Sequence, residues 1–147
     1  MSKDSGSLSD EAVTAWARLV RVSQAVLTLV EADLKAAGLP PLAWYDALLE
    51  LDRVKLDGLR PYQLQERMLL AQYNLSRLTE RLTKAGYIER EDCADDGRGQ
   101  VLHITECGRK LLKSMWPVYQ QAIATHFGRK LEVQQTAELA RILSSLR

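Results

Sequence analysis

The sequence predicts a mainly α fold that carries one small β-hairpin, and two adjacent stretches support this prediction. Between residues 71 and 85, apolar side chains recur at spacings of 4, 3, 4 and 3, the period of a helix with one buried stripe. Gly86 is a strong stop for that helix, because glycine enters the left-handed cap without strain. Residues 87–90 and 100–104 are β-prone and flank the turn-rich segment CADDGRG. A helix followed by a hairpin is therefore expected.

The buried stripe of this helix also fixes its exposed face. The stripe consists of Ala71, Leu75, Leu78, Leu82 and Ala85. At about 100 degrees of rotation per residue, a polar and partly basic face lies on the opposite side. Its members are Tyr73, Ser76, Arg77, Glu80, Thr83 and Lys84.

A long helix is expected at the amino-terminal end, over residues 8–37, with Ser9 as its cap. One apolar stripe in it follows a seven-residue repeat: Val13, Trp16, Val20, Leu27, Val30 and Leu34. A second stripe lies beside the first: Leu19, Val22, Val26 and Leu29. One small domain covers only one such stripe, so the second indicates packing against another subunit.

The remaining elements follow from caps and breakers. A helix is expected to start at Leu39-Pro40-Pro41 and run to about Lys55, and a short helix should open at Pro61, a favoured first position for proline. Thr105 is placed to cap another long helix, which Pro117 should kink or split near Trp116. The last segment, residues 131–147, reads as a short amphipathic helix.

Composition bounds the class of protein. The chain has 147 residues, 46% of them hydrophobic and 27% charged, and no apolar run exceeds four residues. A single cytoplasmic domain is expected, without a membrane span or signal peptide. The net charge of +1 is uninformative, but residues 60–90 carry six cations against three anions, a local excess of +3. Residues 91–98 carry four acids against Arg98, a net −3.

Two helices, a tight turn and a hairpin make a winged helix-turn-helix. The segment RMLLAQYNLSRLTERLTKAGYIER, followed by DDGRGQVLHITECGRKLL, resembles the MarR family of bacterial regulators. The family's wing pattern is matched by Asp96, Arg98, Ile104, Thr105 and Gly108. The resemblance spans nearly the whole chain and implies one domain over residues 1–147. Within it, residues 8–37 and 106–147 would form a helical dimerisation region, and residues 39–105 the DNA-binding region.

This resemblance implies a sequence-specific DNA-binding transcriptional regulator, a homodimeric and ligand-responsive repressor that binds a pseudo-palindromic operator. The alternative is a winged-helix protein-interaction module without DNA affinity, which predicts partner binding that is insensitive to salt. The local excess of +3 over residues 60–90 favours DNA.

Candidate DNA contacts lie on the helix and on the wing. The amino-terminal end of a recognition helix approaches base edges, which selects Gln72, Tyr73, Asn74, Ser76 and Arg77. Arg77 could read guanine and Asn74 adenine. Phosphate contacts are expected from Arg81, Lys84 and Arg67. At the wing, the resemblance implies that Arg98 enters the minor groove and that Asp96 orients it.

The first turn of this helix departs from the family pattern. Ala71 stands where family members often have a small hydroxyl residue as cap, and losing a cap costs on the order of 1 kcal/mol. The helix could therefore begin late, at Asn74.

Four aromatic residues are candidates for an effector pocket: Trp16, Trp44, Tyr45 and Trp116. The resemblance implies a small aromatic or phenolic effector there, although aromatics at helical spacing are more often core. No cofactor or metal is expected, since Cys93, His103 and Cys107 match no standard zinc spacing. No catalytic constellation emerges, so the chain is not expected to be an enzyme. Both cysteines are expected to be reduced thiols, and their redox activity stays open.

Overall fold

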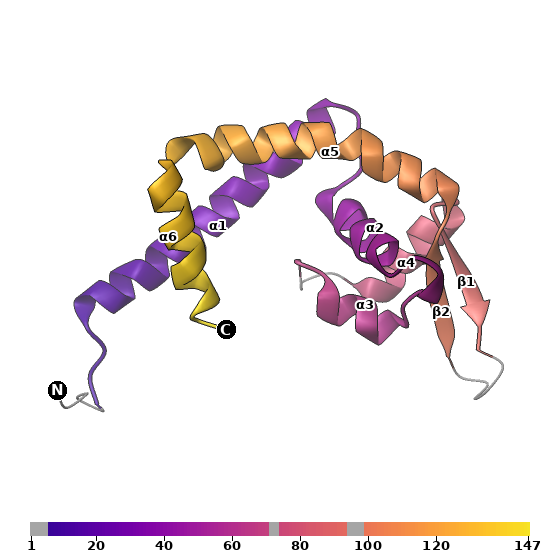
Figure 1. Ribbon diagram of the computed structural model, residues 1–147, viewed down its shortest axis with the longest axis horizontal. Coiled ribbons are helices and arrows are strands. Elements are labelled where there is room, and N and C mark those ends of the chain that lie inside the picture. The colour runs from indigo at the N-terminus through magenta and orange to yellow at the C-terminus, as the bar shows by residue number, and fades with distance from the viewer. Residues whose placement is uncertain (1–5, 71–73, 94–98) are drawn as a thin grey trace.

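The computed structural model describes residues 6–70, 74–93 and 99–147, and it confirms the predicted fold class (Figure 1). The described residues form six α-helices, two short 3-10 helices and one antiparallel two-stranded sheet. Their order is α1 (Asp10–Ala36), α2 (Leu42–Val54), η1 (Lys55–Asp57), α3 (Pro61–Arg67), α4 (Leu75–Lys84), β1 (Ile88–Asp92), β2 (Gln100–Ile104), α5 (Glu106–His126), η2 (Gly128–Lys130) and α6 (Val133–Ser144).

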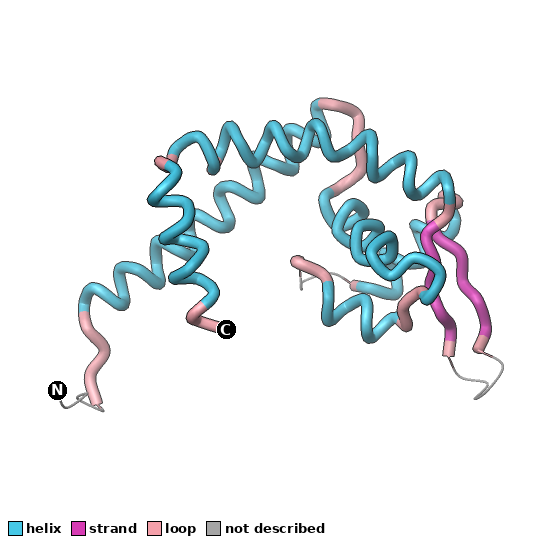
Figure 2. The backbone as a smooth tube through the Cα atoms, viewed as in Figure 1, coloured by secondary structure: helices cyan, strands magenta, loops and turns pink. Residues whose placement is uncertain are grey.

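The molecule has the shape of an arch. Helix α5 spans its top, with α1 and α6 at one end and the helices α2, α3 and α4 with the hairpin at the other (Figure 1). The hairpin lies beside α2 and α4 and extends away from the first turn of α5, as the backbone trace shows (Figure 2). His126 near the end of α5 contacts Asp33 on α1, with 2.8 Å between Nε2 and Oδ2. The two long helices are therefore joined by a polar contact as well as by packing.

Helix α2 is the centre of the core. Leu48 and Leu51 on this helix are completely buried, as are Leu64 on α3, Leu82 on α4 and Met115 on α5. Because the apolar faces of four helices meet at α2, the position of α4 is set by burial rather than by its short connections.

The predicted boundaries at several caps are confirmed. Ser9 Oγ accepts a hydrogen bond from the backbone N–H of Ala12 at 3.1 Å, which caps α1. Thr105 Oγ1 accepts from the N–H of Gly108 at 3.1 Å and donates to the carbonyl of Gly86 at 2.6 Å. Gly86 has φ of 84°, the left-handed conformation expected at the end of the recognition helix. Thr105 thus caps α5 and ties it to the end of α4.

The structure decides between alternatives that the sequence left open for two helices. Helix α4 begins at Leu75 rather than at Ala71, because Asn74 is the cap: its Oδ1 accepts from the N–H of Arg77 at 3.1 Å. This is the late start that the missing hydroxyl cap suggested. Helix α5 is not split at Pro117, which lies inside an unbroken helix. Proline has no N–H, so the carbonyl of Lys113 has no helical donor at Pro117. Both residues are exposed, so solvent can donate to that carbonyl.

Helix α1 carries an apolar surface that the rest of the chain leaves uncovered. The exposed apolar side chains on it are Val13, Trp16, Leu19, Val22 and Leu29. By length and composition alone, α1 is apolar enough to cross a membrane, with a mean hydropathy of 1.2 over its most apolar window, of which 6% is buried. However, Arg18 and Arg21 interrupt this surface, and Val30 and Leu34 near the other end belong to the core.

Candidate nucleic-acid interface

Helix α4 presents a polar face to solvent and an apolar face to the core. Leu78 and Leu82 are buried. The exposed side chains include five predicted to face outward or toward DNA: Ser76, Arg77, Glu80, Arg81 and Lys84. Thr83, predicted to be exposed, is half-buried and donates to the carbonyl of Thr79 at 2.6 Å. The face therefore offers three cations against one anion to a polyanionic partner.

Asn74 combines two roles at the start of α4. Its Oδ1 caps the helix through the N–H of Arg77, while the residue as a whole is exposed. The cap uses the oxygen of this exposed side chain and makes no use of the Nδ2 donor. A contact from Asn74 to adenine remains a prediction, and Nδ2 is the atom that would reach the base.

The hairpin has two distinct faces. Arg90 pairs with Leu102, and Asp92 with Gln100, so these four residues share one face of the sheet. Arg90 Nη2 on this face donates to Thr79 Oγ1 of α4 at 3.3 Å. Side chains that contact α4 therefore lie on one face of the hairpin.

Glu89 and Glu91 lie on the opposite face, with Val101 and His103 as their cross-strand partners. Glu91 Oε2 is 2.8 Å from His103 Nε2. Glu91, one of the four acids in residues 91–98, thus points away from α4, which reduces the repulsion that the net −3 of this segment would impose on DNA.

A buried acid on α2 holds the chain that leads into the recognition helix. Asp46 is 6% exposed. Its Oδ1 accepts from the N–H of Leu69 at 3.0 Å and its Oδ2 from the N–H of Leu70 at 2.8 Å. Sequence reasoning missed this residue, although an acid among the apolar residues of LAWYDALLEL was a signal that could have identified it.

Three aromatic rings cluster between α2 and α5. Tyr45 stacks on Trp116 with ring centroids 6.1 Å apart, and Tyr119 meets both rings edge-on, at 5.1 Å from Tyr45 and 5.9 Å from Trp116. Tyr45 and Tyr119 line an open hollow of about 340 Å³ together with both cationic and acidic side chains. The charged residues around it are Arg53, Arg67, Arg147, Asp46, Glu50 and Glu66.

Burial raises the pKa of both tyrosines in this cluster. The pKa of Tyr119 is raised, first by burial and then by the negative charge of Asp46 and the neighbouring Tyr45 and Glu31. The pKa of Tyr45 is also raised by burial, and Arg53 opposes that shift. Both side chains are therefore neutral phenols that can donate a hydrogen bond to a ligand.

The structure brings together two of the four aromatic residues predicted for an effector pocket, Tyr45 and Trp116, and adds Tyr119. Trp44 turns away from them and packs edge-on against Tyr87 at 5.9 Å. Trp16 is 66% exposed on α1 and has no ring contact among the described residues.

The predicted DNA contacts are placed as follows. Asn74, Ser76, Arg77, Arg81 and Lys84 share the outer side of α4. Arg67 lies beside the hollow that Tyr45 and Tyr119 line, at the opposite end of α3 from the hairpin. Gln72, Tyr73, Asp96 and Arg98 lie outside the described residues.

The cysteines occupy different environments. Cys93 is partly buried at the end of the hairpin, 3.7 Å from Arg60 Nη2, whereas Cys107 is exposed in the first turn of α5. Within the described ranges, no group of three or more His, Cys, Asp or Glu residues is arranged to hold a metal ion.

Helix α3, the turn before α4, the exposed face of α4 and the adjoining hairpin define a winged helix-turn-helix protein. A sequence model of the MarR family matches residues 37–99, which contain this module. This family model and solved structures of MarR family regulators support a MarR-family winged-helix regulator. No curated protein matches it in sequence.

Solved structures extend the similarity over nearly the whole chain. Sco3205, a MarR family transcriptional regulator from Streptomyces coelicolor solved in complex with DNA, shares 25% identity with a TM-score of 0.79, covering 95% of this chain and 91% of that one. AbsC from the same organism shares 26% identity with a TM-score of 0.77, covering 95% and 94%. BpsR from Bordetella bronchiseptica has the same fold, with 18% identity, a TM-score of 0.78 and coverage of 90% and 98%.

Proposed function

We propose that this regulator binds a pseudo-palindromic operator as a homodimer, each copy placing α4 in the major groove, and that it represses transcription in the cytoplasm. The observation that carries the proposal is the polar face of α4, with Arg77, Arg81 and Lys84 exposed beside the hairpin. The structure of Sco3205 in complex with DNA supports the same use of the fold here. Half-sites about one helical turn apart are expected for two such helices.

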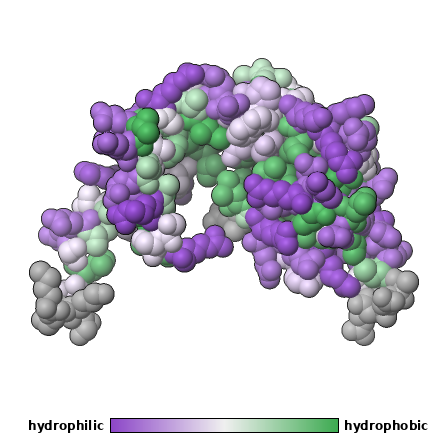
Figure 3. Space-filling view, viewed as in Figure 1, coloured by the Kyte–Doolittle hydropathy of each residue, from purple (hydrophilic) through white to green (hydrophobic). Residues whose placement is uncertain are grey.

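The uncovered apolar surface supports the homodimer. An open hollow of about 640 Å³ between α1 and α6 is lined mainly by apolar side chains, among them Leu19, Val22, Leu139 and Leu143. Figure 3 shows hydrophobic residues gathered beneath the arch, where this end of the molecule meets the DNA-binding end. A second copy would cover this surface. A membrane is a poorer match for this surface than a second copy. Arg18 lines the same hollow, and its charge would be costly to place in lipid.

In this proposal the chain is one domain with two regions. Residues 39–105 form the DNA-binding region, and residues 8–37 and 106–147 form the dimerisation region that holds two copies of α4 at a fixed spacing. Symmetric dimers of this kind match their operators through that spacing.

The effector is proposed to be a small aromatic or phenolic compound in the hollow beside Tyr45, Trp116 and Tyr119. Tyr45 and Tyr119 line the hollow with two phenol donors, and Trp116 outside the lining stacks on Tyr45, which suits an aromatic ring with a polar substituent. The regulation of DNA binding by 6-hydroxynicotinic acid in BpsR supports an effector of this size. The dimer would have two conformations that differ in the spacing of its two α4 helices. The ligand would act by binding these conformations with different affinity.

The test combines DNA selection with a measurement of mass. The full chain should select a duplex with two inverted half-sites from a randomised library, and light scattering should give the mass of two copies. Val22→Asp, which places a charge on the exposed stripe of α1, should give a monomer and lose most operator affinity. Thr14→Asp is the control, because Thr14 is also exposed on α1 but lies outside the two apolar stripes. A folded monomer that binds no duplex and holds a protein partner at high salt would instead support an interaction module.

A further inference from the structure

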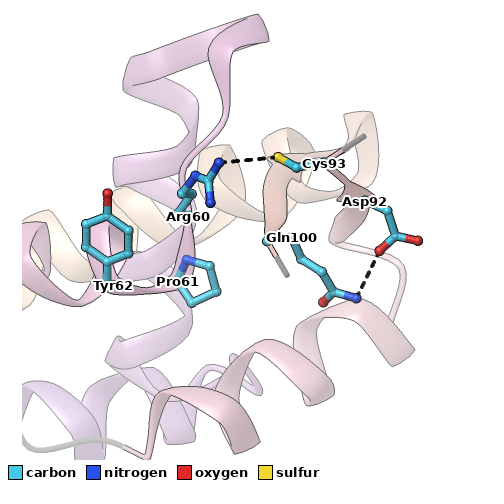
Figure 4. Close-up of a pocket in the computed structure, with 7 residues that line it drawn as sticks. Arg60, Pro61, Tyr62, Asp92, Cys93 and Gln100 are labelled. Carbon is cyan, nitrogen blue, oxygen red and sulfur yellow. Dashed lines mark hydrogen bonds between the residues drawn. The ribbon is translucent and has the colours of Figure 1, made fainter. Parts of the chain in front are cut away.

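Two hollows on the DNA-binding end of the molecule join into one groove. The first, of about 270 Å³, lies between α4 and the hairpin, where Ser76 and Arg90 line it. The second, of about 760 Å³, lies between the start of α3 and the end of the hairpin where Asp92 pairs with Gln100 (Figure 4). Both are lined by Pro61 and Gln100, so the surface is continuous from α4 past α3 to the hairpin. We call this surface the strand groove.

The position of this groove follows from how a winged helix meets DNA. A recognition helix in the major groove and a wing that reaches the adjacent minor groove have one sugar–phosphate strand between them. That strand has to cross the protein surface between α4 and the hairpin. The strand groove occupies this surface.

We propose that the strand groove seats one sugar–phosphate strand of the operator, and that Arg60, Tyr62 and Gln100 are its positioning residues. The proposal rests on the proposed DNA-binding function and adds contacts outside α4 and the wing tip. These residues would set affinity and register without reading base sequence.

The side chains supply the donors that phosphate oxygens accept. Arg60 reaches from the start of α3 toward Cys93, with 3.7 Å between Nη2 and Sγ, and its guanidinium brings positive charge into the groove (Figure 4). Tyr62 is 60% exposed, so its hydroxyl is accessible to a phosphate. Gln100 Nε2 donates to Asp92 Oδ1 at 3.3 Å and can exchange that acceptor for a phosphate oxygen.

Asp92 opposes binding within this groove. Its carboxylate lines the second hollow and shares a face of the hairpin with Arg90. A phosphate placed beside it would be repelled, so Asp92 should limit the affinity that the groove provides. Glu89 lies on the same strand but on the opposite face, which makes it the matched comparison.

The first test measures how operator binding depends on salt. In the full chain, Arg60→Gln should reduce the slope of log K against log salt by about 1, because one phosphate contact is lost. Arg129→Gln removes the same charge from exposed η2 and should keep the wild-type slope. Thermal melts establish that both variants are folded.

The second test changes charge on the two faces of β1. Asp92→Asn should tighten operator binding roughly two- to fivefold, the range expected for one partly exposed charge pair. Glu89→Gln makes the same change in net charge and should tighten binding less. Equal effects of the two variants would overturn a phosphate seat at Asp92.

The third test needs no substitution. Cys93 lines the groove and Cys107 does not, so the selected duplex should slow alkylation of Cys93 by iodoacetamide and leave Cys107 unchanged. If the wild-type chain binds the duplex but Cys93 reacts as before and Arg60→Gln keeps the full slope, the strand-groove proposal alone is wrong. If the wild-type chain binds no duplex, the proposed function and this inference fail together.

Discussion

The carboxylate of Asp46 on α2 lies 2.8 Å from the backbone nitrogen of Leu70, which stands just ahead of the recognition helix. The other carboxylate oxygen accepts from the N–H of Leu69 at 3.0 Å, so each oxygen serves one amide. Asp46 is also the charged group that contributes most, after burial, to the raised pKa of Tyr119 in the aromatic cluster. One side chain therefore contacts both the approach to α4 and the proposed effector hollow.

We predict that Asp46→Asn destabilises the fold and weakens operator binding. The amide of asparagine turns an N–H donor toward one of two backbone N–H groups, which leaves that buried donor without an acceptor. For a fully buried donor such a loss costs about 1–3 kcal/mol, and these two hydrogen bonds are part-buried, so a cost toward the lower end is expected. Urea denaturation should show a lower midpoint with an unchanged slope, and anisotropy should show weaker binding, since α4 loses its fixed approach.

Asp57→Asn is the control for this prediction. Asp57 is exposed in η1, and the substitution removes the same charge. Its denaturation midpoint should stay at the wild-type value. An Asp46→Asn protein as stable as Asp57→Asn would show that the two backbone hydrogen bonds contribute little.

We predict that Arg77 and Arg81 contribute differently to DNA binding. Arg77 is in the first turn of α4, and Arg77→Ala should cost about 1–3 kcal/mol on the operator while flattening the preference at one base position. Arg81→Ala, one turn further along, should weaken binding to all duplexes alike and lower the salt slope by about 1. Competition anisotropy with single-base variants separates the two effects. A uniform loss for Arg77→Ala would reassign it to phosphate.

Local features made much of the fold predictable. The spacing of Leu78 and Leu82, the cap at Thr105 and the stop at Gly86 depend on neighbours within a few residues, and each is confirmed. The β-prone residues 100–104 likewise form a strand, β2, in which Leu102 and Ile104 are buried. Periodicity and caps are properties of short segments, so one sequence suffices to find them.

Features that join distant segments were not predictable. The bonds from Asp46 to Leu69 and Leu70 cross 23 and 24 positions of sequence, and the stacking of Trp116 on Tyr45 joins α5 to α2. Arg60 enters the strand groove only because the end of the hairpin folds back toward α3. The periodicity of one segment carries no information about which distant segment it faces. These contacts could therefore be identified only from the folded structure.

We predict that stability falls at alkaline pH and that Tyr119 contributes to the fall. Burial raises the native pKa of Tyr119 above its ordinary value of 10.0, whereas the unfolded phenol ionises at the ordinary value. The stabilisation is therefore complete below about pH 10 and is lost as pH rises from there through the native pKa. Tyr119→Phe cannot ionise, so its urea midpoint should decline less steeply above pH 10.

The comparison at neutral pH serves as the control for this prediction. Both tyrosine and phenylalanine are uncharged there, so any difference between the two proteins reports packing and the hydroxyl alone. A titration of phenolate absorbance at rising alkaline pH should also show that the variant lacks one tyrosine that ionises above the ordinary pKa. Parallel declines of the two midpoints above pH 10 would mean that Tyr119 ionises with its ordinary pKa.

We predict that Gly108→Ala is strongly destabilising, because α5 and the base of the hairpin approach each other closely there. A Cβ at Gly108 would lie 2.3 Å from the carbonyl oxygen of Tyr87 and 2.7 Å from Ile104 Cγ1, and the first of these is backbone that cannot rotate away. Overpacking of this kind typically costs about 1–3 kcal/mol. Gly128→Ala is the matched control, since its Cβ would meet nothing closer than 3.8 Å. Thermal melts should show a lower midpoint for Gly108→Ala only. Operator affinity should fall with it, because the junction fixes the hairpin to α5 and thus to the proposed dimerisation region.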